Sequence, residues 1–369
     1  MNIFFCYHLD KYSGWGTLSI NYINAFKDKK SIIFCNKSNP QIRYKQYAIL
    51  RDPLIYLKNP FLIFTDSFKL IKILNKINNK FKNKLTLHIL VEPYILFLIF
   101  ISKFFKNKIF YCIGSYSNIL ANSLKFKFFF KIVLSLTTHL IFLSTYSKKI
   151  ILNKISVKKS CKIIILNPMI KLKTSTKKRK GKSFTILSVG AIKERKGYHH
   201  LIELMNILIN KFKLNISLCI VGNIDENFYF NNLISKIKKY KIEKNIIFSG
   251  KVNDNELNKF YENCNIFALL SNKSGYNFEG YGIVYLEALA KGKQVIISEE
   301  SGGVDIKKVN KKIFTTKPDA YNNISNFIKK IYYNKILLTP KENVLVYRKT
   351  FKNNVDIFNK FKKSISINC

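Results

Sequence analysis

The stretch that decides the fold is EGYGIVYLEALAKGKQVIISEESGG, residues 279–303. It predicts a glycine-containing turn, then an apolar helix over Gly282–Ala290, then a buried strand over Gln294–Ile297. The apolar run Ile266–Leu270 comes before the turn and predicts another buried strand. Strands that alternate with helices at this spacing are typical of a parallel sheet with crossover helices. We therefore expect an α/β layer domain in this part of the chain.

The same alternation extends outward from this stretch. Upstream in the same half, we expect strands at Phe184–Ile192, Ile216–Val221 and Asn245–Ser249, and helices at His199–Phe212, Phe228–Lys239 and Glu256–Cys264. In the first half, we expect strands at Ile3–Leu9, Ser31–Cys35, Phe61–Thr65, Leu85–Val91, Ile109–Ile113, His139–Ser144 and Lys162–Leu166. The helices between them are expected at Thr17–Phe26, Phe68–Lys80, Asn118–Leu136 and Thr145–Ile155. A second α/β domain is therefore expected in residues 1–170.

One segment interrupts the pattern. Lys171–Ser183, KLKTSTKKRKGKS, has a single apolar residue and is rich in Lys, Ser and Thr, which is typical of an interdomain linker. A nuclear-localisation or nucleic-acid patch is the competing interpretation. The predicted organisation is residues 1–170, a linker over 171–183, a second domain over 184–345, and a C-terminal helix within 346–369. That helix, Tyr347–Ser364, places several apolar side chains on one side.

The charge is strongly basic. Lys and Arg total 64 against 21 acidic residues, a net charge of +43. Residues 1–180 contribute +28 and the remainder +15. Such a field attracts polyanions such as nucleic acid, anionic lipid headgroups or phosphorylated substrates, and the plainer alternative is a solvated basic surface. Hydrophobic residues make up 47% of the chain, which indicates a globular protein and excludes a disordered one.

Cysteine usage and hydropathy bear on location. The seven cysteines are scattered and form no C-x-x-C pair, which indicates a reducing compartment. The start, MNIFFCYHLD, has no signal-peptide pattern and predicts a buried strand. Tyr94–Ser102, YILFLIFIS, is too short to cross a bilayer and predicts a core helix, with an interfacial membrane segment as the alternative. We expect a cytoplasmic protein that binds peripherally to the cytoplasmic face of a membrane.

The sequence motifs of several enzyme classes are absent from the chain. The chain has no D-x-D, no H-E-x-x-H, no G-x-x-x-x-G-K-[ST] and no G-x-S-x-G. Zinc hydrolysis, P-loop phosphoryl transfer and α/β-hydrolase chemistry are therefore disfavoured. No cofactor and no metal are expected.

The turn before the 282–290 helix is the candidate site. Gly280 and Gly282 have no Cβ, so a ligand can approach the backbone closely. The free N–H groups at the helix start, over Gly282–Val284, can bind a phosphate. Glu287 can accept hydrogen bonds from the paired hydroxyls of a ribose, and Glu279 can reach sugar hydroxyls. The alternative is an ordinary helix with one capping and one surface glutamate.

A second candidate contact is the turn VGAIKERKG, Val189–Gly197, which follows a predicted strand. Arg195 and Lys196 would face a ligand at the carboxyl end of the sheet, where open α/β folds bind ligands. The alternative is an exposed basic loop that also contains Lys193.

The chain resembles the retaining glycosyltransferases of family 4, the glycosyl transferases group 1. The resemblance is strong over residues 184–309. It rests on VGAIKERKGYHHLIE, SLCIVGN, NIIFSGKVNDNELNKFYENCNIFALLS and EGYGIVYLEALAKGKQVI with SGG. It implies an α/β fold of two Rossmann-like domains facing across a cleft, called GT-B, with the C-terminal helix crossing back to the N-terminal domain.

The resemblance also implies roles for single residues. Glu279 and Lys196 would be catalytic, with Glu279 on the donor sugar and Lys196 on the leaving diphosphate. Glu287 would hold the ribose. The other donor-binding residues would be Arg195, Gly280, Tyr281, Gly282, Ile283 and Val284. Ala191 stands where the family often has Arg, so Arg195 or Lys193 would have to supply that cation.

The first half resembles the family more weakly. Residues 13–16, SGWG, resemble its glycine-rich loop beside the nucleotide, which places Gly14 and Gly16 with the donor. CIGSYS, Cys112–Ser117, resembles a stretch that often has His where Ile113 stands, so Ser115 is an acceptor-side candidate. His88 is another, although a lone His near the end of a buried strand is more often structural.

The implied activity is a metal-independent transfer, with retention of configuration, from a nucleotide-diphosphate sugar to a lipid-linked or polysaccharide acceptor, as in lipopolysaccharide or capsule synthesis. The expected partners are the sugar nucleotide, a glycan or glycolipid acceptor and an anionic membrane surface. A sugar-nucleotide epimerase of the same fold is one alternative. A basic nucleic-acid-binding or membrane-binding protein without activity is another, although the basic run contains no aromatic residues to stack on bases. A degenerate transferase, impaired by Ala191, is the third.

Overall fold

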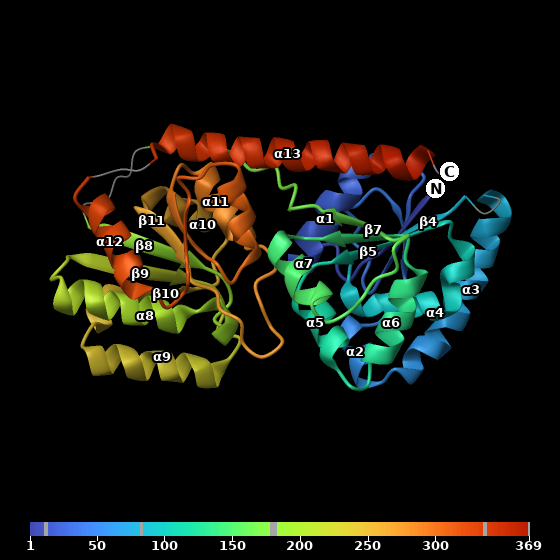
Figure 1. Cartoon of the computed structure of the whole chain (residues 1–369), viewed down its shortest axis with the longest axis horizontal. Helices are drawn as coiled ribbons and strands as arrows, with labels where there is room; N and C mark the ends of the chain where they lie inside the picture. The colour runs from blue at the N-terminus through green and yellow to red at the C-terminus, as the bar shows by residue number, and fades with distance from the viewer. Residues whose placement is uncertain (11–13, 82–83, 178–182, 335–337, 368–369) are drawn as a thin grey trace. The chain divides into compact units, whose positions relative to one another are not determined.

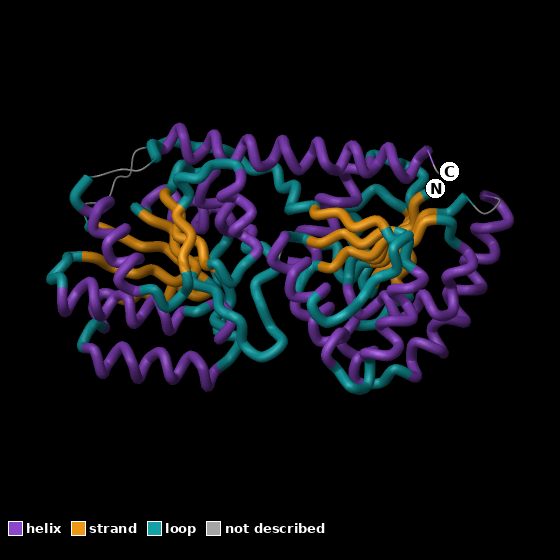
Figure 2. Tube along the Cα trace, in the orientation of Figure 1, coloured by secondary structure: helices purple, strands orange, loops and turns teal. Residues whose placement is uncertain are grey.

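The computed structural model describes residues 1–10, 14–81, 84–177, 183–334 and 338–367. The chain divides into two compact units (Figure 1). The first consists of Met1–Ile170 together with Asn353–Cys369, and the second of Lys171–Lys352. Each unit contains one parallel sheet with helices on both faces, as Figure 2 shows by colour. The α/β class expected from the alternation is therefore confirmed.

The sheet of the first unit has the order β3-β2-β1-β4-β5-β6-β7. Its strands are β1 Asn2–Phe5, β2 Ile32–Cys35, β3 Lys45–Ala48, β4 Thr86–Ile89, β5 Asn107–Cys112, β6 His139–Phe142 and β7 Lys162–Ile165. All neighbours are parallel, and β1 lies between β2 and β4, with Ile3 beside Ile32 on one side and Leu87 on the other. Apart from the polar edge strand β3, continuous apolar runs mark these strands because helices cover the sheet on both faces.

The helices of the first unit are α1 Gly14–Phe26, α2 Pro53–Lys58, α3 Phe61–Phe81, α4 Leu98–Ile101, α5 Ser115–Asn122, α6 Lys127–Leu136 and α7 Thr145–Leu152. Two short 3₁₀ helices, η1 Glu92–Phe97 and η2 Ser102–Phe104, flank α4. One face of the sheet carries α1 and the end of the last helix, α13 Pro340–Ile367 (Figure 1). The Phe358 ring lies 5.0 Å from Phe26 of α1, and the Phe361 ring lies 5.8 Å from His139 of β6. The expected return of the C-terminal helix to the N-terminal domain is thus confirmed.

Several first-half predictions were wrong or incomplete. Phe61–Thr65, predicted as a strand, is the first turn of α3, because the apolar residues continue at helical spacing to Ile77. The helix predicted over Asn118–Leu136 is two helices separated at residues 123–126. The polar strand β3 and the six-residue α2 were not predicted. Tyr94–Ser102 lies mostly in the core, as expected, although η1, α4 and η2 divide it into short turns.

The sheet of the second unit has the order β10-β9-β8-β11-β12-β13. Its strands are β8 Phe184–Val189, β9 Ile216–Val221, β10 Ile246–Gly250, β11 Ile266–Leu269, β12 Gln294–Ser298 and β13 Phe314–Thr316. All pairs are parallel, and the strands predicted in this half are confirmed apart from shifts at their ends. The three-residue β13 was not predicted.

The helices of the second unit are α8 Tyr198–Asn206, α9 Asn227–Tyr240, α10 Asp254–Asn263, α11 Ile283–Ala290 and α12 Tyr321–Tyr332, followed by the first part of α13. Short turns are η3 Glu194–Lys196, the π-helical η4 Ile207–Lys211, η5 Glu243–Asn245 and η6 Gly302–Lys308. One hydrophobic cluster joins α8, α9 and α12 to the sheet. The parallel arrangement brings the loops after β8 and β11 to the same edge of the sheet, at their carboxyl ends.

The predicted linker is only partly described, since residues 178–182 lie outside the described ranges. Residues 171–177 have no regular secondary structure. They are tied to the second unit, because Leu172 N–H donates to Tyr347 Oη at 2.7 Å and Ser175 N–H donates to Ala290 O at 2.9 Å.

The six described cysteines, up to Cys264, are buried free thiols. Within the described ranges, no helix is both long and apolar enough to cross a bilayer.

Candidate functional site

Three charged side chains meet at the carboxyl edge of the second unit's sheet. Arg195 and Lys196 lie in η3, the turn after β8, and Glu279 lies in the loop between β11 and α11. Arg195 Nη1 and Lys196 Nζ each lie 2.7 Å from the same oxygen, Glu279 Oε2. A bridge between Glu279 and Ser301 fixes the backbone of this loop. The structure therefore brings Glu279 together with two candidates that include Arg195, which is 84 residues away in the sequence.

The cluster is largely removed from solvent. The side chains of Lys196 and Glu279 are 11% and 12% exposed, so their attraction is weakly screened. Burial by itself would raise the pKa of Glu279, but the charges of Lys196 and then Arg195 outweigh it and lower that pKa to about 2. Burial lowers the pKa of Lys196, and Glu279 opposes this shift. Two cations share one carboxylate, so the cluster has a net positive charge available to an anionic ligand.

The turn that holds the two cations requires a glycine at its end. Gly197 has φ +68°, and a Cβ there would lie 1.8 Å from the carbonyl oxygen of Leu270. This close approach packs η3 against the end of β11, and the Asn272 N–H donates to Arg195 O at 3.1 Å. The glycine therefore brings the basic turn and the Glu279 loop together.

Gly282 is the N-cap of α11 and has φ +84°. A Cβ at this position would lie 2.5 Å from the Tyr285 ring, which is itself fixed by a 2.6 Å hydrogen bond from Tyr285 Oη to Leu269 O. No described side chain caps α11, so its first N–H groups, including those of Ile283 and Val284, remain directed past the helix end. A helix start of this kind binds anions such as phosphate.

The two residues before this cap differ in what they can offer a ligand. The side chain of Tyr281 is 1% exposed. Its hydroxyl is buried and has no hydrogen-bond partner in the described part of the chain. Because the side chain is buried, Tyr281 could contact a donor only through its backbone. Gly280 is partly exposed beside it and can be approached directly.

Glu287 lies on the second turn of α11 and is half-buried. Tyr261 of α10 donates from its Oη to Glu287 Oε2 at 2.7 Å. Among the described residues, the other carboxylate oxygen accepts no hydrogen bond. Burial raises the pKa of Glu287, and the bond from Tyr261 partly opposes this shift. Tyr261 was missed at the sequence level, because nothing in the spacing of 26 residues indicates that α10 and α11 are neighbours.

Because Ala191 stands where the family often has Arg, one expected cation is missing. Lys193 and Arg195 were the two residues proposed to supply it, and the structure gives them different partners. Lys193 Nζ forms an ion pair with Asp225 at 2.9 Å. Arg195 instead joins the Glu279 cluster. Of the two, only Arg195 is therefore brought to the candidate site.

In the first unit, Glu92 joins the two predicted segments. Trp15 Nε1 donates to Glu92 Oε2 at 2.7 Å, and Gly114 N–H donates to Glu92 Oε1 at 2.9 Å. Glu92 thereby holds the start of α1, where Gly14 and Gly16 lie, against the start of α5, where Ser115 lies. Burial raises the pKa of Glu92, against the hydrogen bonds that its carboxylate accepts. Ser13, the first residue of the predicted loop, lies outside the described residues.

Sequence reasoning also missed Glu92. The residue directly follows the predicted strand Leu85–Val91, and an acidic residue at the carboxyl end of a parallel strand could have been noticed.

His88 has to be removed from the acceptor-side candidates. It is fully buried in β4, and its ring stacks on Phe4 with centroids 4.6 Å apart. Tyr22 Oη lies 3.1 Å from Nδ1, and Asn2 Oδ1 lies 3.1 Å from Nε2. Burial lowers its pKa well below the usual value. With no exposed surface and both ring nitrogens engaged, His88 has the structural role that the alternative interpretation gave it.

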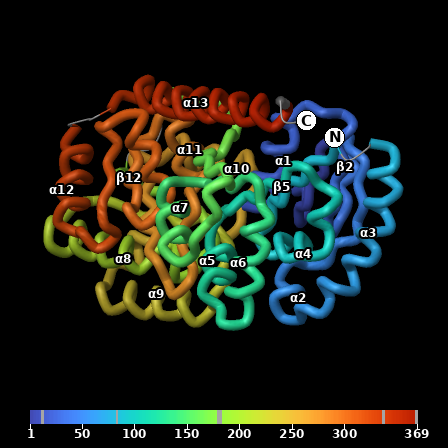
Figure 3. The backbone as a smooth tube through the Cα atoms, turned by 45° about the vertical axis from the view of Figure 1, so that its right-hand side comes forward, coloured from blue at the N-terminus to red at the C-terminus, as the bar shows by residue number. Residues whose placement is uncertain are grey.

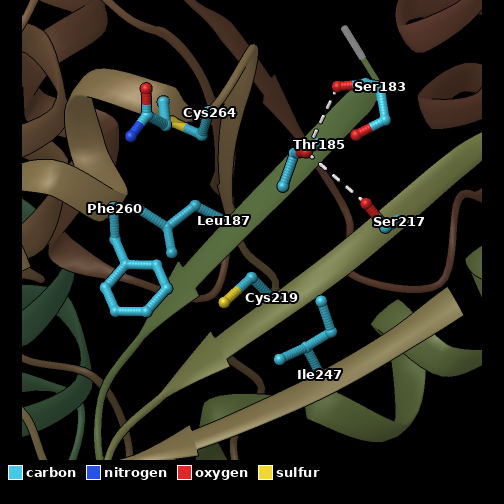
Figure 4. A pocket seen from close by; sticks show the side chains of 9 residues that line it. Ser183, Thr185, Leu187, Ser217, Cys219, Ile247, Phe260 and Cys264 are labelled. Atoms are coloured by element: carbon cyan, nitrogen blue, oxygen red, sulfur yellow. Dashed lines mark hydrogen bonds between the residues drawn. The ribbon is translucent and has the colours of Figure 1, made fainter. Parts of the chain in front are cut away.

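The second unit also has a cavity of about 290 Å³, away from these residues (Figure 4). It lies between the sheet and α10 and is lined by Ser183, Thr185, Leu187, Ser217, Cys219, Ile247, Phe260, Asn263 and Cys264. The lining is mainly apolar and includes none of the predicted site residues. In the described ranges, no group of three or more His, Cys, Asp or Glu side chains is arranged to hold a metal ion.

Comparison with known proteins finds a family that part of the chain resembles. Residues 171–349 match the family described as glycosyl transferases group 1. A glycosyltransferase of Methanocaldococcus jannaschii is 31% identical over 123 residues, which cover 33% of this chain and 29% of the relative. Mannosylfructose-phosphate synthase of Agrobacterium fabrum is 28% identical over 121 residues, 32% of this chain and 26% of that protein. The matches thus span less than a third of either relative's length.

The crystal structure of Anabaena HepE in complex with UDP and glucose is similar to this chain over 99% of both, with a TM-score of 0.74 and 14% identity. At that identity the likeness concerns the fold alone. Residues 171–349 are thus similar to the glycosyl transferases group 1 family, and the two Rossmann-like units of the chain have the GT-B fold.

Proposed function

We propose that the chain transfers a sugar from a nucleotide-diphosphate sugar to a glycan or glycolipid acceptor, with retention of the anomeric configuration. One observation carries the proposal: Arg195, Lys196 and the uncapped start of α11 converge at the carboxyl edge of the unit that matches the family. This edge offers cations and backbone N–H groups to a diphosphate. The similar Anabaena structure contains UDP and glucose, which supports this class of donor.

The donor would bind across α11 and η3. The N–H groups of Gly282–Val284 would hold a phosphate, and Lys196 with Arg195 would neutralise the diphosphate. Glu287 would accept hydrogen bonds from the ribose hydroxyls through the oxygen that Tyr261 leaves available. Glu279 already orients both cations, and its second oxygen would contact the donor sugar. Gly14 and Gly16 remain proposed donor contacts.

The chemistry would depend on stabilising the leaving group. The bond between the anomeric carbon and the diphosphate oxygen breaks, and the acceptor oxygen bonds to that carbon on the same face. The negative charge that develops on the diphosphate is stabilised by Lys196, Arg195 and the start of α11. A donor phosphate oxygen takes the acceptor proton, so no second protein carboxylate is needed. These cations serve the role of a divalent metal, so we propose a metal-independent reaction.

The acceptor would be lipid-linked or a polysaccharide and would bind the first unit, with Ser115 as a candidate contact. The support is the basic charge of residues 1–170, which have 27 Lys and Arg against 5 acidic residues, a net charge of +22. We propose that the protein works at the cytoplasmic face of a membrane, and its buried free thiols suit a reducing compartment.

The test is nucleotide release. Purified full-length protein is incubated with a panel of UDP-, GDP- and ADP-sugars and with membrane extract as the acceptor source, in the presence of EDTA. We expect release of the nucleoside diphosphate with one donor, and incorporation of its sugar into the extract. Glu287→Ala should abolish release, whereas Glu243→Ala, an exposed glutamate of the same unit, should not. No turnover with any donor would contradict the proposal, and so would conversion of the donor sugar to its epimer without transfer.

A further inference from the structure

Exposed apolar side chains gather on one group of helices in the first unit. Single exposed apolar residues are normal on a protein surface, but a cluster of them marks an interaction site. Between residues 54 and 132, the large apolar side chains that are at least 36% exposed are Leu54, Ile55, Phe61, Phe64, Phe68, Ile99, Leu124, Phe128, Phe129 and Ile132. They belong to α2, α3, α4, α6 and the turn before α6. These helices lie on the face of the sheet opposite α1 (Figures 1 and 3).

Three phenylalanines form a ridge along α3. Phe61, Phe64 and Phe68 are 66%, 43% and 53% exposed and lie at the spacing of one helix side. The ring centroids are 5.9 Å apart for Phe61 and Phe64, and 4.8 Å apart for Phe64 and Phe68. Phe64 also meets Phe100 of α4, with centroids 5.7 Å apart. The ridge is therefore a fixed apolar surface and not a set of isolated side chains.

A second apolar group lies at the start of α6. Phe128 and Phe129 are 68% and 47% exposed, with ring centroids 5.9 Å apart. Leu124, in the turn before α6, is 99% exposed. The helix α4 packs against both α3 and α6 and connects the two groups. We call this surface of α3, α4 and α6 the aromatic–lysine face.

The charge of this face has a single sign. Between residues 53 and 136 the only acidic residues are Asp66 and Glu92, which are 2% and 1% exposed. Arg51 and Lys69 pair with Asp66, and Glu92 is held by Trp15. All exposed charged side chains described in this segment are lysines, namely Lys58, Lys69, Lys72, Lys76, Lys80, Lys84, Lys103, Lys106, Lys125, Lys127 and Lys131.

We propose that the aromatic–lysine face docks on an anionic lipid bilayer. Phenylalanines on a helix side enter the boundary between headgroups and acyl chains, and lysines beside them reach lipid phosphates while their stems stay in apolar surroundings. A protein partner would need a surface both apolar and acidic, whereas an anionic bilayer provides both properties everywhere. The inference rests on the membrane-bound acceptor of the proposed function, and it names the residues that would bring the enzyme to that acceptor.

The test is sedimentation of the full-length protein with vesicles of phosphatidylcholine alone, or with about 30% phosphatidylglycerol, at low and high salt. Wild type should bind the anionic vesicles and be partly released by salt, since the lysine contribution is screened. Replacing Phe61, Phe64 and Phe68 by Ser should lower the partition coefficient about tenfold or more. Replacing Lys125, Lys127 and Lys131 by Gln should lower it about tenfold or more, and only on anionic vesicles.

Matched controls come from the second unit. Replacing Phe228, Ile247 and Tyr333 by Ser removes three exposed apolar side chains, 80%, 50% and 62% exposed. Replacing Lys238, Lys239 and Lys241 by Gln removes the same charge from α9 and its end. Both controls should bind vesicles like wild type. The emission of Trp15, the only tryptophan, shows whether the first unit of each variant is folded.

The inference would be overturned if wild type did not bind anionic vesicles at low salt, or if the controls and the face variants lost equal amounts of binding. The inference would also be overturned if the protein bound no lipid and self-associated in a way that the Phe variant abolishes. That result would assign the face to a second copy of the chain.

Donor turnover separates this inference from the proposed function. Wild type that releases nucleotide but ignores vesicles contradicts only the docking face, whereas wild type that binds vesicles without turnover contradicts only the transferase.

Discussion

At the scale of single residues, Glu279 is the centre of the candidate site, because one of its oxygens contacts both cations. Replacing it by Gln would leave Lys196 buried without its counter-charge. We expect Glu279→Gln to lower the free energy of unfolding by about 2–4 kcal/mol at pH 7. Urea unfolding followed by circular dichroism measures this loss, with the exposed Glu243→Gln as a control expected to show almost none.

The stability difference between wild type and Glu279→Gln should depend on pH. The pKa of Glu279 is lowered to about 2 in the folded chain, so its ionised form stabilises the fold above the ordinary glutamate pKa of 4.5. That contribution disappears as the pH falls from 4.5 toward 2. The difference between wild type and Glu279→Gln should therefore narrow over this range. A difference that stays constant would show that the ion pairs contribute nothing to stability.

Tyr261 is expected to orient Glu287 for a ribose through its 2.7 Å hydrogen bond. Tyr261→Phe removes this bond, and we expect the dissociation constant for the bound nucleoside diphosphate to rise about three- to tenfold. The control is Tyr240→Phe in the same unit, which removes a similar bond from Tyr240 Oη to Glu203 at 2.8 Å. Equal affinities of the two variants would argue against the role of Tyr261.

The sequence could propose members of the candidate site, but it could not show their contacts. Motif and spacing indicated Glu279, Glu287 and Lys196, because these residues lie in turns that follow predicted strands. Tyr261 and Glu92 were missed, since their contacts depend on which helices and loops pack together. His88 was included because its burial in the core could not be established from a lone His in an apolar run.

At the scale of elements, the start of α11 depends on Gly282. Its φ of +84° is unfavourable for a residue with a side chain, and an added Cβ would clash with the Tyr285 ring at 2.5 Å. We expect Gly282→Ala to destabilise the chain by about 2–4 kcal/mol and to weaken phosphate binding at the helix start. Gly275 is the control, because it has φ +55° and no atom within 4 Å of an added Cβ. Gly275→Ala should cost only about 1 kcal/mol in thermal or urea unfolding. Equal losses would show that the contact with Tyr285 is unimportant.

The elements that the sequence predicted are those with continuous apolar runs. The five strands predicted in the second half pair as parallel neighbours, and all of them except the edge strand β10 are largely buried. The missed β3 is a polar edge strand with the sequence KQYA, and β13 has only three residues. Neither has enough apolar periodicity to be detected. The start of α3 was taken for a strand because its exposed phenylalanines, spaced for a helix, also lengthen an apolar run.

At the scale of the whole molecule, the last helix ends in the first unit although the chain immediately before it belongs to the second. Phe358 is 1% exposed, and its ring lies 5.0 Å from Phe26 and 5.7 Å from Tyr22. We expect Phe358→Ala to destabilise the first unit by about 3–5 kcal/mol. Trp15 fluorescence reports unfolding of this unit alone, because Trp15 is the only tryptophan.

The neighbouring Ile357 provides the control. It lies on the same helix and is 38% exposed. Ile357→Ala should change the fluorescence midpoint little, by about 0.5 kcal/mol. If Phe358→Ala were equally mild, the C-terminal segment would be attached to the first unit without stabilising it.

The central claim is that α11 and its carboxylate form a nucleotide site, and calorimetric titration with UDP, GDP and ADP tests it most directly. We predict that one of these ligands binds wild type, and that Glu287→Ala weakens its binding about tenfold or more while Glu243→Ala leaves it unchanged. Equal affinity of wild type and Glu287→Ala for every ligand, or no binding to wild type at all, would contradict the account.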